Sequence, residues 1–166
     1  MSGSISKSSS TDEGDPLSSE ERSMIEERTR AFPGVMEEMH ADLAELADFL
    51  QVANYRLTRD GLEELAQALG ALLSNGNLAA IDEEQRIWLH TRMMYLIGEL
   101  LNERHGGHWF LESDPDSDFY GRYVVGGFRH DPDRLVDPAE AAYEVLNDEP
   151  RRDLLGEIDR LGTDPR

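Results

Sequence analysis

The stretch Asp82–Trp109, DEEQRIWLHTRMMYLIGELLNERHGGHW, decides the fold because it predicts one long helix that ends at a double glycine. Asp82 can cap the N-terminus, and Gln85, three residues later, can complete a reciprocal capping box. At about 100° per residue, the apolar side chains form one continuous arc around roughly half of the helix. The arc consists of Ile87, Leu89, Met93, Met94, Leu96, Ile97, Leu100 and Leu101. Such a wide arc must be covered on two flanks, so we expect this helix to be the centre of the core.

Two residues on this apolar face, His90 and Gly98, have no apolar side chain. His90 lies within the arc, and we interpret it as a core histidine with one hydrogen-bonded nitrogen rather than as a ligand or catalytic base. Gly98 lies on the same face. A helical glycine costs about 1 kcal/mol relative to alanine, so it indicates that another element approaches closely there. Gly106 and Gly107 permit the left-handed conformation that closes a helix, and Trp109 begins an extended segment.

Three helices are predicted before the central one. A capping box at Ser18 opens the first, which we expect to end just before Phe32-Pro33-Gly34 because proline interrupts a helix. The second carries an apolar stripe over residues 35–50, with spacings of three and four. Thr58 caps the third, whose leucines between Leu62 and Leu73 again share one face.

After the central helix, the pattern changes from helical to extended. Residues 108–111 and 119–128 indicate two strands joined by an acidic hairpin loop, and residues 134–136 can add a third short strand. A proline-led helix start follows at Asp137, and apolar residues over 154–161 form the face of a last helix. The predicted class is α+β, mostly helical, with five to six helices around a long central helix. A small antiparallel hairpin or three-stranded sheet completes it.

Composition bounds the class of protein. Residues 18–166 are long enough for a single domain with a buried core, whereas residues 1–17 are rich in serine, glycine and aspartate and should be disordered. The chain has no cysteine, which excludes disulfides, thiolate metal sites and cysteine nucleophiles. No apolar run approaches the roughly 20 residues that span a bilayer, and the N-terminus lacks the apolar region of a secretory signal. We therefore expect a cytoplasmic protein without a membrane partner.

The formal net charge is −19, which argues against direct binding to a nucleic-acid backbone. Lys7 is the only lysine, a composition that fits a GC-rich bacterial genome or a halophile. An acidic surface keeps a protein soluble through repulsion and most readily approaches a basic protein partner. The oligomeric state stays open.

Few residues suggest catalytic or metal chemistry. Glu103, His105 and His108 cluster at the end of the central helix, and two histidines with a carboxylate are suitable zinc ligands. However, the two histidines lie on either side of the Gly-Gly turn. No single helical face therefore fixes their geometry, as it does in the HExxH motif. We keep these three residues as candidate metal ligands and assign no metal.

Asp114, Asp116 and Asp118 have the spacing that begins an EF-hand loop, which needs glycine at its sixth position and glutamate at its twelfth. Those positions hold Phe119 and Val125, so we interpret the segment as a solvated hairpin tip. No serine lies in a GxSxG elbow, and the chain has neither a Walker lysine nor a GxGxxG loop. We therefore assign no catalytic residue and no cofactor.

The candidate interaction residues are aromatic and acidic. Trp88 and Tyr95 are expected at an exposed edge of the central helix, with Glu99 on the same polar side. The remaining candidates are Trp109, Asp114, Asp116 and Asp118. Such an edge can bind a partner or support self-association.

Two runs near the end of the central helix, Tyr95-Leu96-Ile97-Gly98-Glu99 and His105-Gly106-Gly107-His108-Trp109, resemble a signature of several uncharacterised bacterial families. In those families a YLGE helix end is followed by a Gly-Gly-x-Trp turn, a hairpin and a helix start similar to Asp137-Pro138. Here Gly61-Leu62 replaces their usual Ser-Leu pair, and an inserted isoleucine lengthens the YLGE motif. The resemblance covers about residues 52–147. It implies an intracellular α+β domain, in families of which some members are immunity-like.

The leading hypothesis is a non-enzymatic cytoplasmic protein that binds or regulates a basic protein partner, with an immunity or inhibitor role as one concrete form. Two alternatives stay open. A metal-dependent hydrolase would use Glu103, His105 and His108. An acidic nucleic-acid mimic would need carboxylates spaced like phosphates along one continuous surface.

Overall fold

The computed structural model describes residues 18–75, 80–147 and 153–163. These residues form five helices and a three-stranded antiparallel sheet, so the predicted mostly helical α+β class is confirmed. The predicted disordered tail, residues 1–17, lies outside the described residues.

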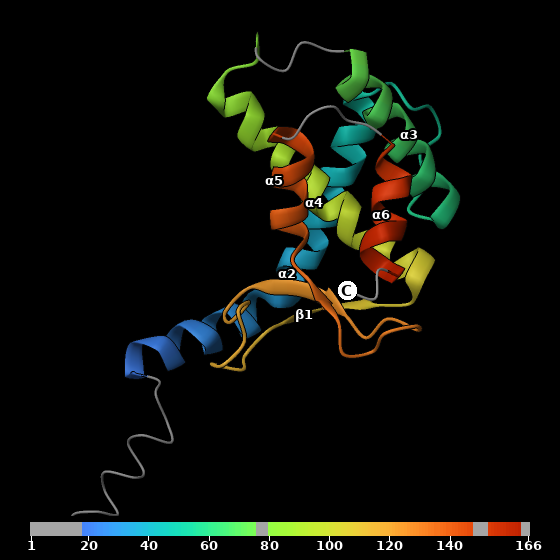
Figure 1. Ribbon diagram of the computed structural model, residues 1–166. Helices are drawn as coiled ribbons and strands as arrows, with labels where there is room; N and C mark the ends of the chain where they lie inside the picture. The colour runs from blue at the N-terminus through green and yellow to red at the C-terminus, as the bar shows by residue number, and fades with distance from the viewer. Residues whose placement is uncertain (1–17, 76–79, 148–152, 164–166) are drawn as a thin grey trace, which may run out of the picture.

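Helix α4 (Glu83–His105) is the central helix, and it packs against the four other described helices and against β1 and β2. Figure 1 shows it crossing the molecule behind α5 and α6, with the sheet below. Asp82 Oδ1 accepts a hydrogen bond from the Gln85 amide at 2.8 Å, and Gln85 Oε1 accepts one from the Asp82 amide at 3.0 Å. Gly106 closes the helix at φ 81°. Both predicted ends are therefore confirmed.

Helix α2 (Ser19–Phe49) is continuous, so the break predicted at Phe32-Pro33-Gly34 is wrong. Proline removes one backbone hydrogen bond, but packing holds the helix on both sides of it. The ring of Phe32 lies 5.7 Å from that of Tyr123, and Met36 packs against the core. The C-terminal half buries Met39, Leu43, Leu46 and Ala47. The N-terminal half, blue in Figure 1, projects past the sheet.

The remaining helices are α3 (Arg59–Asn75), α5 (Pro138–Asn147) and α6 (Leu154–Thr163). The predicted N-caps are present at the starts of α3 and α5. Thr58 Oγ1 accepts a hydrogen bond from the Gly61 amide at 3.1 Å, and Asp137 Oδ1 accepts one from the Ala139 amide at 3.0 Å. These caps fix where α3 and α5 begin against α4.

The sheet has the order β1-β2-β3 and is antiparallel throughout. Its strands are β1 (His108–Leu111), β2 (Tyr123–Gly126) and β3 (Leu135–Val136). Strand β2 is shorter than the predicted 119–128, because residues 119–122 form turns around Gly121, whose φ is 80°. Gly127, at φ 74°, follows the strand directly. The hairpin therefore has a longer loop than the sequence predicted.

Most of the predicted apolar arc of α4 is buried, and Gly98 explains how the sheet reaches it. A Cβ on Gly98 would lie 2.0 Å from Cζ2 of Trp109, so the predicted close approach is confirmed. The predicted hydrogen bond of His90 is confirmed, since its Nε2 donates to the Ala139 carbonyl at 2.8 Å. Its predicted place in the core is wrong, because the residue is half-buried and lines a concave surface beside α5. The exception in the arc is Ile87, which is 59 % exposed.

Candidate functional site

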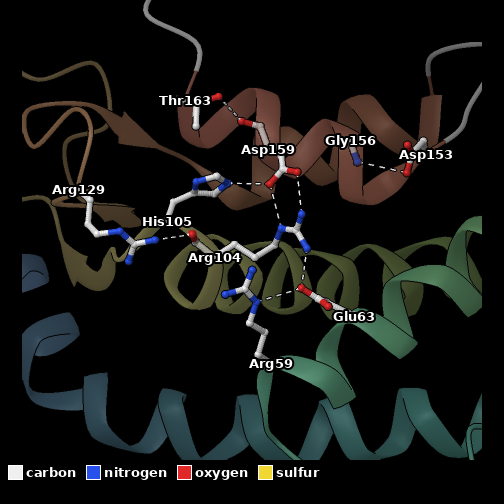
Figure 2. Close-up of polar contacts among 9 residues, drawn as sticks. All are labelled: Arg59, Glu63, Arg104, His105, Arg129, Asp153, Gly156, Asp159 and Thr163. Carbon is white, nitrogen blue, oxygen red and sulfur yellow. Dashed lines mark hydrogen bonds and ion pairs between the residues drawn. The ribbon is translucent and has the colours of Figure 1, made fainter.

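The candidate metal ligands at the end of α4 have separate environments. His105 is 8 % exposed, and its Nε2 lies 2.9 Å from Asp159 Oδ1 on α6 (Figure 2). His108 is exposed on β1, where its ring contacts that of Phe110 at 5.3 Å between centroids, and Glu103 is exposed. Among the described residues, no group of three or more His, Cys, Asp or Glu side chains could hold a metal ion. The imidazole of His105 packs closely on α6, where a Cβ on Gly162 would lie 2.3 Å from its Cδ2.

Arg104 forms an ion-pair network that fastens α3 and α6 to α4. Its Nε and Nη2 donate to the two carboxylate oxygens of Asp159 at 2.9 and 2.7 Å, and its Nη1 donates to Glu63 at 2.5 Å (Figure 2). The hydrogen bonds that Asp159 accepts from Arg104 and from His105 hold the pKa of its carboxyl below the usual value. The network contains acids and bases, but each is paired within it. We therefore interpret it as structural.

The expected exposed edge of α4 is partly wrong. Tyr95 is 8 % exposed, and the charges of Glu38 and Asp42 on α2 act on it because that helix covers this flank. Burial raises the pKa of the Tyr95 phenol. Trp88 is half-buried between the Phe49 ring, 5.2 Å away, and the Arg92 guanidinium, 4.3 Å away.

Glu99 and Trp109 also point into the protein. The indole Nε1 of Trp109 donates to Glu99 Oε2 at 3.1 Å, and Trp109 is buried against Gly98. Burial raises the pKa of Glu99, although the hydrogen bond from Trp109 opposes this effect. Both residues serve the packing of β1 on α4 and offer little surface to a partner.

The acidic hairpin loop lies between β1 and β2. Asp114, Asp116 and Asp118 are exposed, and the turn is closed locally. Asp114 Oδ1 accepts from the Asp116 amide at 2.9 Å, and the Asp114 carbonyl accepts from the Ser117 amide at 3.0 Å. This arrangement agrees with the predicted solvated hairpin tip.

A concave surface that the sequence did not indicate lies between the first half of α4 and α5. We call it the α4–α5 hollow; its volume is about 560 Å³. It is lined by Glu83, Arg86, Ile87, His90, Tyr143, Leu146 and Asn147. Two of these side chains are large, apolar and exposed: Ile87 at 59 % and Tyr143 at 63 %. Exposed apolar groups that gather at one concavity are typical of interaction surfaces.

The lining of the α4–α5 hollow contains one carboxylate, Glu83, and one guanidinium, Arg86, and further acids lie in the two segments that form it. The two flanking segments, residues 82–90 and 138–147, contain several acids and a single arginine, Arg86. The acids are Asp82, Glu83, Glu84, Glu140 and Glu144, all of them exposed. The hollow therefore combines exposed apolar side chains with flanking segments in which acids outnumber arginine. The one sequence signal that could have indicated this hollow is Tyr143, a tyrosine on the outer face of the short amphipathic helix α5.

Comparisons of the chain with protein-family models, with curated proteins and with solved structures found no match. The resemblance of residues 52–147 to bacterial families therefore stays a prediction. Within the described ranges, no helix has both the length and the hydrophobicity that crossing a bilayer requires.

Proposed function

We propose that this chain is a protein-binding protein that captures a basic protein partner at the α4–α5 hollow. The observation that supports this most directly is the exposure of Ile87 and Tyr143 at one concave surface. Tyrosine is enriched among the residues that contribute most to binding, because it presents a large, fairly rigid and partly polar surface. A partner side chain that enters the hollow would remove both apolar groups from water.

The charge around the hollow supports a basic partner. Exposed carboxylates near an apolar centre raise the rate of encounter with a positively charged protein and disfavour acidic competitors. A suitable partner segment carries arginine or lysine around one apolar side chain, as a basic amphipathic helix does. An immunity or inhibitor role in the cytoplasm is one concrete form of this function.

The two alternative functions have less support. A hydrolase that uses Glu103, His105 and His108 is not favoured, because His105 is engaged by Asp159. A nucleic-acid mimic needs one continuous acidic surface, whereas exposed carboxylates of the described residues are spread over α2, α3, α4 and α5. A protein partner with a defined apolar contact fits this distribution better.

Isothermal titration calorimetry with a synthetic peptide tests the proposal. The peptide is an amphipathic helix with arginines around a leucine face, titrated at low and at high salt. Tyr143→Ala should weaken binding by about 2 kcal/mol, roughly thirtyfold, because it removes the main apolar contact. The control is Leu57→Ala, which truncates another exposed apolar residue, in the α2–α3 connection. Equal affinity of both variants and wild type would count against the proposal.

A second pair of variants separates local charge from total charge. Glu83→Gln with Glu84→Gln removes the exposed carboxylate that lines the hollow and its neighbour in the sequence, and Glu26→Gln with Glu27→Gln removes two exposed carboxylates from the projecting half of α2. Both double variants have the same net charge. We expect the first to slow peptide association and the second to leave it nearly unchanged. Equal effects would mean that overall charge attracts the peptide without a defined surface.

A further inference from the structure

A second concavity, which we call the α2–sheet groove, lies between α2, α4, the sheet and the start of α5. Its volume is about 520 Å³, within the range of roughly 300–1,000 Å³ that small-molecule sites occupy. Its apolar lining includes Met36, Met94, Tyr95, Trp109, Tyr123 and Ala139. The two methionines are flexible and adapt to ligands of different shape. Size and lining therefore suit a small molecule with an apolar body.

Arg28 supplies a fixed positive charge at this groove. Its Nη1 donates to the Gly121 carbonyl at 2.7 Å, and its guanidinium lies 5.8 Å from the centroid of the Tyr123 ring. The Tyr123 hydroxyl donates in turn to the Arg28 carbonyl at 2.8 Å. Arg28 forms no ion pair within the described ranges, so none of their carboxylates directly neutralises this cation.

The other charged residues of the groove differ from Arg28. Arg122 donates to Asp137 Oδ2 at 2.7 Å, and Asp137 is 5 % exposed, so these two charges offset each other. Glu140 is exposed on α5, whereas Arg28 belongs to the α2 wall. Of the two arginines that line the groove, Arg28 is therefore the one without a partner carboxylate in the described part of the chain. It lies on α2, whereas Glu140 lies on α5.

We propose that the α2–sheet groove binds a small amphiphilic carboxylate, whose alkyl or aryl body lies on the apolar lining and whose carboxylate accepts hydrogen bonds from Arg28. A charge-assisted hydrogen bond from arginine favours an anionic head group over a neutral one of equal size. The apolar body supplies affinity through burial against the aromatic and methionine side chains. The groove and the α4–α5 hollow have no lining residue in common, so the two proposals can fail independently.

Titration calorimetry with decanoate and with decanol tests this site, in a buffer salty enough to screen the net negative charge. Wild type should bind decanoate about tenfold more tightly than decanol, because only the anion uses the Arg28 guanidinium. Arg28→Gln should abolish this preference. Arg30→Gln removes the same charge from the same helix outside the groove, and it should keep the preference. Ala139→Phe, which fills the groove from α5, should remove binding of both compounds.

Three results would overturn the proposal. They are no heat of binding for decanoate with wild type, equal affinities for decanoate and decanol, and an unchanged preference in Arg28→Gln. Circular dichroism of each variant confirms that it folds before titration. If Arg28→Gln does not fold, methyl decanoate replaces the variant, because this ester removes the charge from the ligand. Binding of the ester as tight as that of decanoate would also overturn the proposal.

Discussion

Replacing Gly98 by alanine perturbs the contact between α4 and the sheet. The new Cβ would lie 2.0 Å from Cζ2 and 2.6 Å from Cη2 of Trp109, so the indole has to move. Trp109 is buried, and its Nε1 donates to Glu99 at 3.1 Å. A displaced indole would therefore disturb both the packing and this hydrogen bond.

The expected magnitude follows from three opposing contributions. Alanine gains about 1 kcal/mol over glycine in helix propensity. Overpacking costs about 1–3 kcal/mol, and losing a hydrogen bond to a charged acceptor costs about 1.5–3 kcal/mol. We expect Gly98→Ala to lower the free energy of unfolding by about 2–4 kcal/mol. At about 3 °C per kcal/mol for a chain of this size, Tm should fall by about 6–12 °C.

Urea unfolding followed by circular dichroism measures the effect, with Gly34→Ala as the matched control. Gly34 is also helical, in α2, and a Cβ there would have no heavy atom within 4 Å. Gly34→Ala should therefore raise the free energy of unfolding by about 0.5–1 kcal/mol through propensity alone. If Gly98→Ala were as stabilising as Gly34→Ala, α4 would not pack directly on Trp109, and the reasoning about the core would be wrong.

Three further predictions concern charge. Burial raises the pKa of Glu99, so its charged form destabilises the folded protein at neutral pH. Glu99→Gln, which keeps an acceptor for Trp109, should therefore be more stable than wild type in urea at neutral pH. This advantage should vanish as the pH falls below the usual carboxyl pKa. Arg104→Met should cost about 1–2 kcal/mol in urea unfolding and speed amide exchange in α6. Wild type should lose stability as the pH falls from the usual carboxyl pKa through the lowered pKa of Asp159. The Arg104→Met variant should lose less stability over the same pH range. Finally, raising the sodium chloride concentration should raise Tm in a thermal melt, because it screens the repulsion behind a net charge of −19.

Sequence reasoning located the features that depend on neighbouring residues. The capping box of Asp82 and Gln85 needs only residues three positions apart, and Gly106 ends α4 because few residues adopt its left-handed conformation. Gly98 was informative for a different reason. A glycine within a strongly apolar helix face has few explanations other than close packing, and Trp109 proved to be the neighbour.

The features that sequence reasoning missed depend on tertiary packing. Pro33 does not break α2, because contacts on both sides of it hold the helix. Ile87 shares the period of the core residues but lines the α4–α5 hollow, and periodicity alone does not show which part of a helix face a neighbouring helix covers. The pairing of Arg104 with Asp159 joins residues 55 positions apart, which no local pattern predicts.

The α4–α5 hollow is tested most directly by photo-cross-linking in a cell extract of the source organism. A photoreactive benzoylphenylalanine replaces Tyr143 in one variant and the exposed Leu57 in a control. The proposal predicts that the probe at position 143, but not at position 57, cross-links a basic protein, and that high salt lowers the yield. Equal cross-linking from both positions, or cross-links at position 143 only to acidic proteins, would contradict it.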